Sequence, residues 1–171
     1  MDYCILYKLE KLDEKLVIVD KSNLAHNYKI IKNRTGISKI ISVIKGDSYG
    51  HGMVECSKTL YQSGTRDFYL ARLEDAIKIR KENYKNTNIY LLSGTISKNV
   101  CKKIKNYNIT PIINNLHQLE ILNKYSNTIK HVLHFDTGMN RLGFKYNEIV
   151  KIKELTKDNQ IKFIMTHLSS A

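Results

Sequence analysis

Residues 42–52 read Ser42-Val43-Ile44-Lys45-Gly46-Asp47-Ser48-Tyr49-Gly50-His51-Gly52, an apolar run that delivers a lysine and then breaks into a glycine-rich loop. Barrel enzymes place their active sites at the C-terminal ends of strands. A lysine held there is poorly solvated when charged, so its neutral amine becomes accessible and can form a Schiff base with an aldehyde cofactor. This stretch therefore predicts a strand-end active site around Lys45.

The rest of the chain alternates between short apolar strands and amphipathic helices. The predicted strands span residues 39–44, 67–71, 88–92, 109–113, 130–135 and 161–165. The predicted helices span residues 22–33, 53–63, 73–82, 97–106, 116–125 and 146–156. Apolar strands separated by helices indicate a parallel sheet with right-handed crossovers, so the fold class is α/β.

The number of strands defines which α/β fold is expected. A (β/α)8 TIM-type barrel needs eight strands and about 250 residues, whereas six strands are predicted here. We therefore expect residues 1–171 to form the N-terminal part of an incomplete (β/α)8 barrel with six parallel strands, the remaining strands being absent. Such an open sheet would expose strand edges and apolar surface.

Composition excludes several classes of protein. The chain is 42% hydrophobic and 26% charged, and no stretch approaches the ~20 apolar residues of a membrane helix. The N-terminus shows no export signal, which predicts a cytoplasmic location. Cys4, Cys56 and Cys101 form no C-x-x-C pattern, so we expect reduced thiols and neither a disulfide framework nor a zinc site.

The charge pattern argues against a nucleic-acid partner. The formal net charge is +12, but the excess lysines are scattered, with Lys102-Lys103-Ile104-Lys105 the densest group. Clustered cations are what gain affinity by releasing counterions from phosphates, so a solvated surface is the better interpretation. His131 and His134 form an H-x-x-H pair, but residues three apart on a strand point to opposite faces, which argues against a metal site.

Three segments resemble one enzyme family. Residues 45–52 resemble the pyridoxal 5'-phosphate (PLP) attachment signature of alanine racemases, whose common form is Lys-Ala-Asp/Asn-Ala-Tyr-Gly-His-Gly, with Gly46 and Ser48 in place of small alanines. Residues 136–144 resemble the family's Asp-Thr-Gly-Met-x-Arg-Leu-Gly block, and residues 165–171 its Thr/Ser-His-Phe-x-x-Ala segment. The resemblance runs from about Lys15 to Ala171, and residues 17–24 resemble the opening before the barrel.

The resemblance implies a role for four residues. Lys45 would carry PLP and act as a catalytic base, and the hydroxyl of Tyr49 would bind the cofactor phosphate. Arg141 would contact the phenolic oxygen of PLP and the substrate carboxylate, to which its planar donors are suited. His167 would lie beside the pyridine ring. Without the family motifs, each is more simply explained as a surface lysine, a packing tyrosine, a solvated arginine in a turn or a core histidine.

The resemblance also implies an activity and its partners. Alanine racemases are isomerases that interconvert L-alanine and D-alanine through a PLP Schiff base and supply D-alanine for the cell wall. They are homodimers in which a tyrosine from the partner subunit's C-terminal β-domain is the second base. That domain is absent from this sequence, so we expect the truncated chain to be inactive alone.

The sequence departs from the family pattern at one position, and three alternatives to a complete racemase stay open. Many family members have a carbamylated lysine where this chain has His134, and its negative charge positions the arginine. The chain could be half of a split enzyme that needs a complementary C-terminal fragment, a vestigial PLP-binding fragment, or a single-barrel PLP-handling protein. The block that contains Arg141 favours the racemase family over the last of these.

Overall fold

The computed structural model describes residues 17–156 and 160–170. Lys15, Ala171 and Cys4, on which part of the sequence analysis falls, lie outside the described residues. The strands are β1 (Ser42–Val43), β2 (Asp67–Leu70), β3 (Asn88–Leu91), β4 (Thr110–Ile113), β5 (His131–His134) and β6 (Ile161–Met165). The helices are α1 (Lys21–Thr35), α2 (Lys45–Tyr49), α3 (Met53–Gln62), α4 (Leu73–Lys81), α5 (Lys98–Asn106), α6 (Leu116–Ser126), the 3-10 helix η1 (Tyr146–Glu148) and α7 (Ile149–Leu155).

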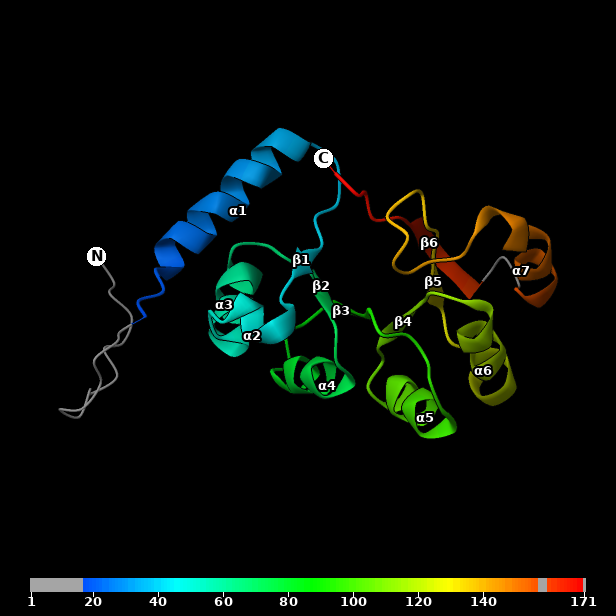
Figure 1. Cartoon of the computed structure of the whole chain (residues 1–171). Coiled ribbons are helices and arrows are strands. Elements are labelled where there is room, and N and C mark those ends of the chain that lie inside the picture. The colour runs from blue at the N-terminus through cyan, green and yellow to red at the C-terminus, as the bar shows by residue number, and fades with distance from the viewer. Residues whose placement is uncertain (1–16, 157–159, 171) are drawn as a thin grey trace.

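The strands form one parallel sheet in the order β1-β2-β3-β4-β5-β6, as the sequence predicts. The sheet is curved, and α3 to α7 lie along its convex side (Figure 1). This α/β arrangement of six parallel strands confirms the predicted fold class. Among the described residues, β1 and β6 each pair on one side only, so the sheet has two free edges.

Three elements differ from the prediction. The first strand is only Ser42–Val43, shorter than the predicted 39–44, although the Ile44 nitrogen extends the pairing by donating to Tyr69 O at 3.0 Å. Residues 46–49 form a separate left-handed turn, which an apolar pattern cannot reveal. The predicted helix 146–156 begins as the 3-10 turn η1 before α7.

The apolar core has a layer on each side of the sheet. On the convex side, Phe68, Leu70, Ile89 and Leu91 from the strands are fully buried against the helices. Each side chain of this size contributes about 1.5–3 kcal/mol when it is buried. Because side chains alternate along a strand, the intervening residues face the concave side and form a second layer. That layer consists of Tyr90, Ile112 and Val132, with Ile41, Tyr69, Leu92, Phe163 and Met165 packed against it.

The concave layer joins strands that are not neighbours in the sheet. The rings of Tyr90 on β3 and Phe163 on β6 meet edge to face with centroids 5.4 Å apart. The hydroxyl of Tyr69 on β2 donates to Met165 Sδ on β6 at 3.9 Å. Burial, together with the charge of Asp67, raises the pKa of Tyr69 to about 12, so its hydroxyl remains a donor. These contacts hold the sheet in its curved form.

A polar network lies at the N-terminal edge of the sheet, around the buried carboxylate of Asp67. Asp67 Oδ1 accepts from Asn88 Nδ2 at 2.9 Å and from the Tyr90 hydroxyl at 3.0 Å, and it pairs with Lys39 Nζ at 3.1 Å. Lys162 Nζ on β6 donates to Asn88 Oδ1 at 2.8 Å. A buried carboxylate is tolerated only with such partners, so this network stabilises the same curvature.

We predict that the stability of the fold decreases in mild acid because of His131. Its ring is 1% exposed, Nδ1 donates to Ile129 O, and Nε2 has no partner within the described residues. Burial lowers the pKa of His131 below 6.5. The unfolded chain therefore binds the proton more readily, and stability present above pH 6.5 is lost as the pH falls below it, by up to about 1.4 kcal/mol per pH unit for one group.

Urea unfolding followed by circular dichroism between pH 7.5 and 5 measures this loss. The substitution His131→Leu should reduce the pH dependence, with a remainder from His134, whose pKa burial also lowers. The surface substitution His117→Leu is the matched control. Equal pH dependence in His131→Leu and the unmodified chain would contradict the prediction.

Candidate functional site

The parallel topology puts four of the predicted site residues at one edge of the sheet, because the C-terminal ends of all six strands lie there. Lys45 comes two residues after β1, and Tyr49 follows in the same turn. Arg141 lies in the loop after β5, and His167 comes two residues after β6. Ile41 and Met165 pack on the concave side, and the alternation of side chains directs His167 to that side as well, whereas Lys45 begins α2, where this alternation has ended.

The lysine is followed by a strained backbone segment. Gly46, Asp47, Ser48 and Tyr49 have φ values of 58°, 54°, 55° and 56°, a left-handed helical turn. This conformation costs about 1–2 kcal/mol for each non-glycine residue, so other contacts must stabilise it. The turn is closed by backbone hydrogen bonds from Ser48 N to Ile44 O at 3.1 Å and from Gly50 N to Gly46 O at 3.0 Å.

Two side chains hold this turn in place. Asp47 Oδ1 accepts from Met53 N, the first amide of α3, at 2.7 Å. The ring Nδ1 of His51 lies 2.8 Å from Ser48 O and donates to it. The turn is therefore fixed against the start of α3, and Lys45 emerges from a rigid segment.

Lys45 and Tyr49 lie together in the turn that follows β1. Lys45 is half-buried, and its Nζ is 5.9 Å from the centroid of the Tyr49 ring. Within the described residues the amine makes no ion pair. Tyr49 is 63% exposed and Val43, which precedes the turn, is 41% exposed, so an apolar surface and a hydroxyl remain accessible beside the amine.

The loop that carries Arg141 is organised by Asp136. Its carboxylate accepts from Gly138 N and Asn140 N, both at 3.0 Å, and these hydrogen bonds lower the pKa of Asp136. The loop closes where Phe144 N donates to His134 O at 2.7 Å and Asp136 N donates to Phe144 O at 3.0 Å. Arg141 is exposed at the tip.

The segment with His167 is tied to this loop. The hydroxyls of Thr137 and Thr166 are 2.7 Å apart, and Phe135 N donates to Met165 O at 2.9 Å. His167 and Arg141 both lie near enough to lower the pKa of His134 by their charges, although burial is the larger cause. The structure thus groups Arg141, His134 and His167 at the ends of β5 and β6.

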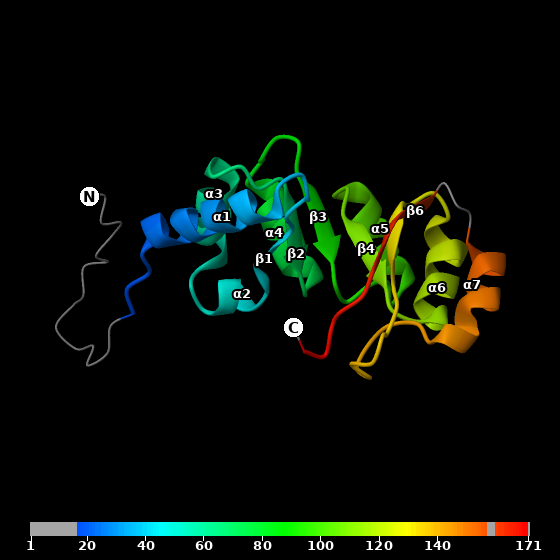
Figure 2. The ribbon, with the colours of Figure 1, turned by 90° about the horizontal axis from the view of Figure 1, so that it is seen from above.

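Lys45 and Tyr49 form a second group at the other end of the curved row of strands. No hydrogen bond between described residues joins the two groups. In both views the segment after β6 runs back toward the β1 end of the sheet (Figure 1 and Figure 2). The concave face therefore turns the two groups toward each other.

The charges at this edge favour an anionic ligand. The carboxylates of Asp47 and Asp136 are both occupied by backbone amides. The amine of Lys45 and the guanidinium of Arg141 have no carboxylate partner among residues 17–156 and 160–170. An amine that can form a covalent bond with an aldehyde, beside an arginine and a tyrosine hydroxyl, fits a phosphorylated aldehyde cofactor and an amino-acid carboxylate.

Asn114 is a residue of this edge that the sequence analysis missed. Its side chain, at the end of β4, accepts a hydrogen bond from His134 Nδ1 at 2.7 Å. The only feature of the sequence that could have pointed to Asn114 is its place directly after an apolar strand.

His131 and His134 have different partners, Ile129 O and Asn114, and no group of metal-ligating residues gathers in the described part of the chain.

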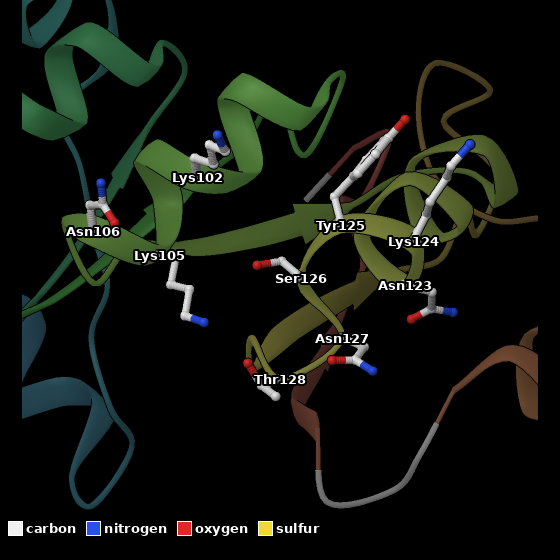
Figure 3. Close-up of a pocket in the computed structure, with 9 residues that line it drawn as sticks. All are labelled: Lys102, Lys105, Asn106, Asn123, Lys124, Tyr125, Ser126, Asn127 and Thr128. Atoms are coloured by element: carbon white, nitrogen blue, oxygen red, sulfur yellow. The ribbon is translucent and has the colours of Figure 1, made fainter.

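A hollow of about 370 Å³ lies at the opposite edge of the sheet, between the ends of α5 and α6 (Figure 3). Its lining is polar and includes Lys102, Lys105 and Lys124. Lys105 and Lys124 lie in the last turns of α5 and α6, where the partial negative charge of a helix C-terminus favours cations. Because it lies at the opposite edge of the sheet, the hollow is separate from the candidate site.

None of the described helices is long and apolar enough to cross a membrane.

Residues 19–171 match the family described as alanine racemase, N-terminal domain. The chain belongs to the alanine racemase family. The alanine racemase of Rickettsia canadensis is 34% identical over 159 residues, which cover 88% of this chain and 44% of that protein. That of Rickettsia bellii is 36% identical over 137 residues, covering 76% of this chain and 33% of that protein.

Solved structures of alanine racemases share the fold. The enzyme of Bartonella henselae, solved with covalently bound pyridoxal phosphate, has 26% sequence identity and a TM-score of 0.80, covering 89% of this chain and 44% of that one. The enzyme of Clostridium difficile, in complex with cycloserine, has 29% identity and a TM-score of 0.76, covering 87% and 43%. The chain thus spans under half the length of these family members.

We predict that the Arg141 loop depends on the absence of a side chain at Gly143. A Cβ at Gly143 would lie 2.6 Å from Asp136 N and 2.9 Å from the carbonyl carbon of Phe135, whereas a Cβ at Gly138 would meet nothing within 4 Å. Both glycines have positive φ values, 117° and 125°. Gly138→Ala should therefore cost about 1–2 kcal/mol of stability from strain alone, and Gly143→Ala should cost more and displace the loop.

Urea unfolding of both variants tests this difference, with amide chemical shifts of residues 134–144 reporting the position of the loop. Equal losses of stability, with the Asp136 amide resonance unchanged in Gly143→Ala, would contradict the prediction.

Proposed function

We propose that this chain is the PLP-bearing part of an alanine racemase, an isomerase that interconverts L-alanine and D-alanine. The observation that carries the proposal is Lys45 on the rigid turn after β1, at the same edge of the sheet as Arg141 and His167. The free cationic groups at that edge suit an anionic cofactor and substrate. Family membership supports the same assignment.

The residues would hold PLP as the family motifs assign them. Lys45 would attach covalently to the aldehyde, and the Tyr49 hydroxyl, which is exposed beside it, would bind the phosphate. Arg141 would contact the phenolic oxygen, and His167 would lie beside the ring. The relative from Bartonella henselae, with its covalently bound pyridoxal phosphate, supports this cofactor.

The chemistry divides between the cofactor and the protein. When bound, PLP supplies a sink for the electrons left when the Cα proton of an amino acid is removed. Lys45 Nζ would accept or return that proton on one face of the substrate. Arg141 would fix the substrate carboxylate with its planar donors, which orients the Cα–H bond toward the lysine.

Inversion requires a second base on the opposite face. In the family this base is a tyrosine from the C-terminal β-domain of the partner subunit. We therefore propose that racemisation needs the remaining barrel strands and that domain, whether in a homodimer or from a complementary fragment.

We predict that Lys45 is the one lysine that forms a specific covalent adduct with PLP. Incubation with PLP, reduction with borohydride and peptide mapping should locate the label on Lys45. Lys45→Ala should abolish it, whereas Lys58→Ala, which removes an exposed lysine of α3, should leave it unchanged. A label spread over surface lysines such as Lys102 and Lys105, without enrichment at Lys45, would refute the assignment.

We also predict that the 171-residue chain alone does not racemise alanine at an appreciable rate. One positioned acid–base group typically contributes about 10²–10⁴-fold, and the second base of the family comes from the C-terminal domain of the partner subunit. The measurement is conversion of L-alanine to D-alanine with saturating PLP, before and after addition of the C-terminal portion of a family member such as that of Rickettsia canadensis.

Recovery of activity on complementation, and its loss with Lys45→Ala in the complemented sample, would support half of a split enzyme. A labelled Lys45 without recovery would favour the vestigial fragment. Turnover by the isolated chain would show that the second base lies within these 171 residues and would overturn the prediction.

A further inference from the structure

The hollow between the ends of α5 and α6 is lined by cations and neutral polar groups. Its volume is about 370 Å³, and three of its lining residues are lysines, Lys102, Lys105 and Lys124 (Figure 3). The other lining side chains are amides, hydroxyls and the ring of Tyr125, and none of the described residues around it is an aspartate or a glutamate. The hollow therefore offers donors and positive charge to a ligand from solvent.

The three amines have no anionic partner in the described part of the chain. Lys102 and Lys105 make neither an ion pair nor a side-chain hydrogen bond with another described residue. The amine of Lys124 lies 5.4 Å from the centroid of the Tyr125 ring, and the amine of Lys98, at the start of α5, lies 6.0 Å from the same centroid. Lys98 thus adds a fourth cation beside Tyr125. Ammonium groups gathered in this way repel one another unless an anion lies between them.

The helix ends do not account for all of these cations. A helix C-terminus is equivalent to about −0.5 elementary charge, so the ends of α5 and α6 together offset about one of the three lining ammonium groups. Their carbonyl oxygens also have other donors, since Lys105 O accepts from Asn108 N at 3.2 Å and Ser126 O accepts from Ile129 N at 3.1 Å. The lysines are therefore not required as caps, and about two positive charges remain without compensation.

The residue types in the lining select the ligand. Lysine presents a compact charge with three donors, which suits a tetrahedral phosphate, whereas the planar recognition of carboxylates is a property of arginine, which is absent from the lining. Ser126 and Thr128 add hydroxyl donors, and their side chains make no hydrogen bond to another described residue. The volume lies within the range of about 300–1,000 Å³ that is typical of small-ligand pockets, so there is room for two linked phosphates.

We propose that this hollow binds a diphosphate group, with the ammonium groups of Lys102, Lys105 and Lys124 as its charged donors and the hydroxyls of Ser126 and Thr128 as neutral ones. The site lies on the outer helices, at the opposite edge of the sheet from Lys45. It does not rest on the proposed function, because none of its residues takes part in holding PLP. The diphosphate belongs either to free pyrophosphate or to a nucleotide, and both carry the charge that the lining attracts.

Titration of the full chain with sodium pyrophosphate, followed in ¹H–¹⁵N spectra at an ionic strength kept constant with sodium chloride, tests this site. The amides of residues 102–106 and 123–128 should shift together and saturate. Lys102→Gln and Lys105→Gln should each weaken binding about two- to fivefold, the range typical of one exposed ion pair. Lys103→Gln is the matched control, because it removes the same charge from α5 at an exposed position outside the lining, and it should weaken binding clearly less.

Adenosine diphosphate distinguishes the two sources of the diphosphate. Equal affinities for pyrophosphate and adenosine diphosphate would show that the phosphates alone are bound, whereas tighter binding of adenosine diphosphate with shifts of the Tyr125 ring signals would show a nucleotide site. Lys45→Ala should change neither titration, which separates this site from the one proposed for PLP.

Two results would overturn the proposal. One is a titration in which the amides of residues 102–106 and 123–128 do not shift and saturate. The other is a loss of affinity in Lys103→Gln equal to that in Lys105→Gln, because net charge alone would then explain the binding. The substituted lysines are exposed, so the variants should fold, and unchanged amide shifts elsewhere in the spectrum verify this.

Discussion

Contact between β6 and the β2–β3 pair across the concave side is the constraint on which the site depends. In a flat sheet of this strand order, β1 and β6 would lie five spacings apart, roughly 24 Å at about 4.8 Å per spacing. Lys45 and His167 could not then serve one small ligand. The contacts of Phe163 with Tyr90 and of Met165 with Tyr69 bend the sheet, so that its two ends face each other.

The N-terminal edge of the sheet contributes to stability, whereas the C-terminal edge carries the candidate site. At the N-terminal edge, the buried carboxylate of Asp67 is paired with Lys39 and hydrogen-bonded to Asn88 and Tyr90, so it contributes to the stability of the fold. At the C-terminal edge the carboxylates of Asp47 and Asp136 are used by backbone amides to shape loops, which leaves the cationic groups free. This separation of stability from function is general among parallel barrels, because the loops at the C-terminal edge can vary without disturbing the core.

His134 stands where many family members have a carbamylated lysine, and its contacts show how this substitution is accommodated. A buried anion would need several hydrogen bonds to be stable, whereas a neutral imidazole needs one acceptor for its N–H and leaves its other ring nitrogen as an acceptor. Asn114 supplies that acceptor because its own amide is oriented by the carbonyls of Leu92 and Ile112. Through Asn114, His134 is thus connected to the backbone of β3 and β4.

The sequence by itself determined the α/β class, the six strands and the family, because apolar periodicity and the three motifs depend only on neighbouring residues. It also placed Lys45, Arg141 and His167 at strand ends. Only the tertiary structure decided that β1 ends after Val43, that residues 46–49 turn left-handed, and that Asn114 meets His134. These features depend on hydrogen bonds between segments about 20 residues apart or on backbone strain that a fixed loop sustains, and neither leaves a periodic signal in the chain.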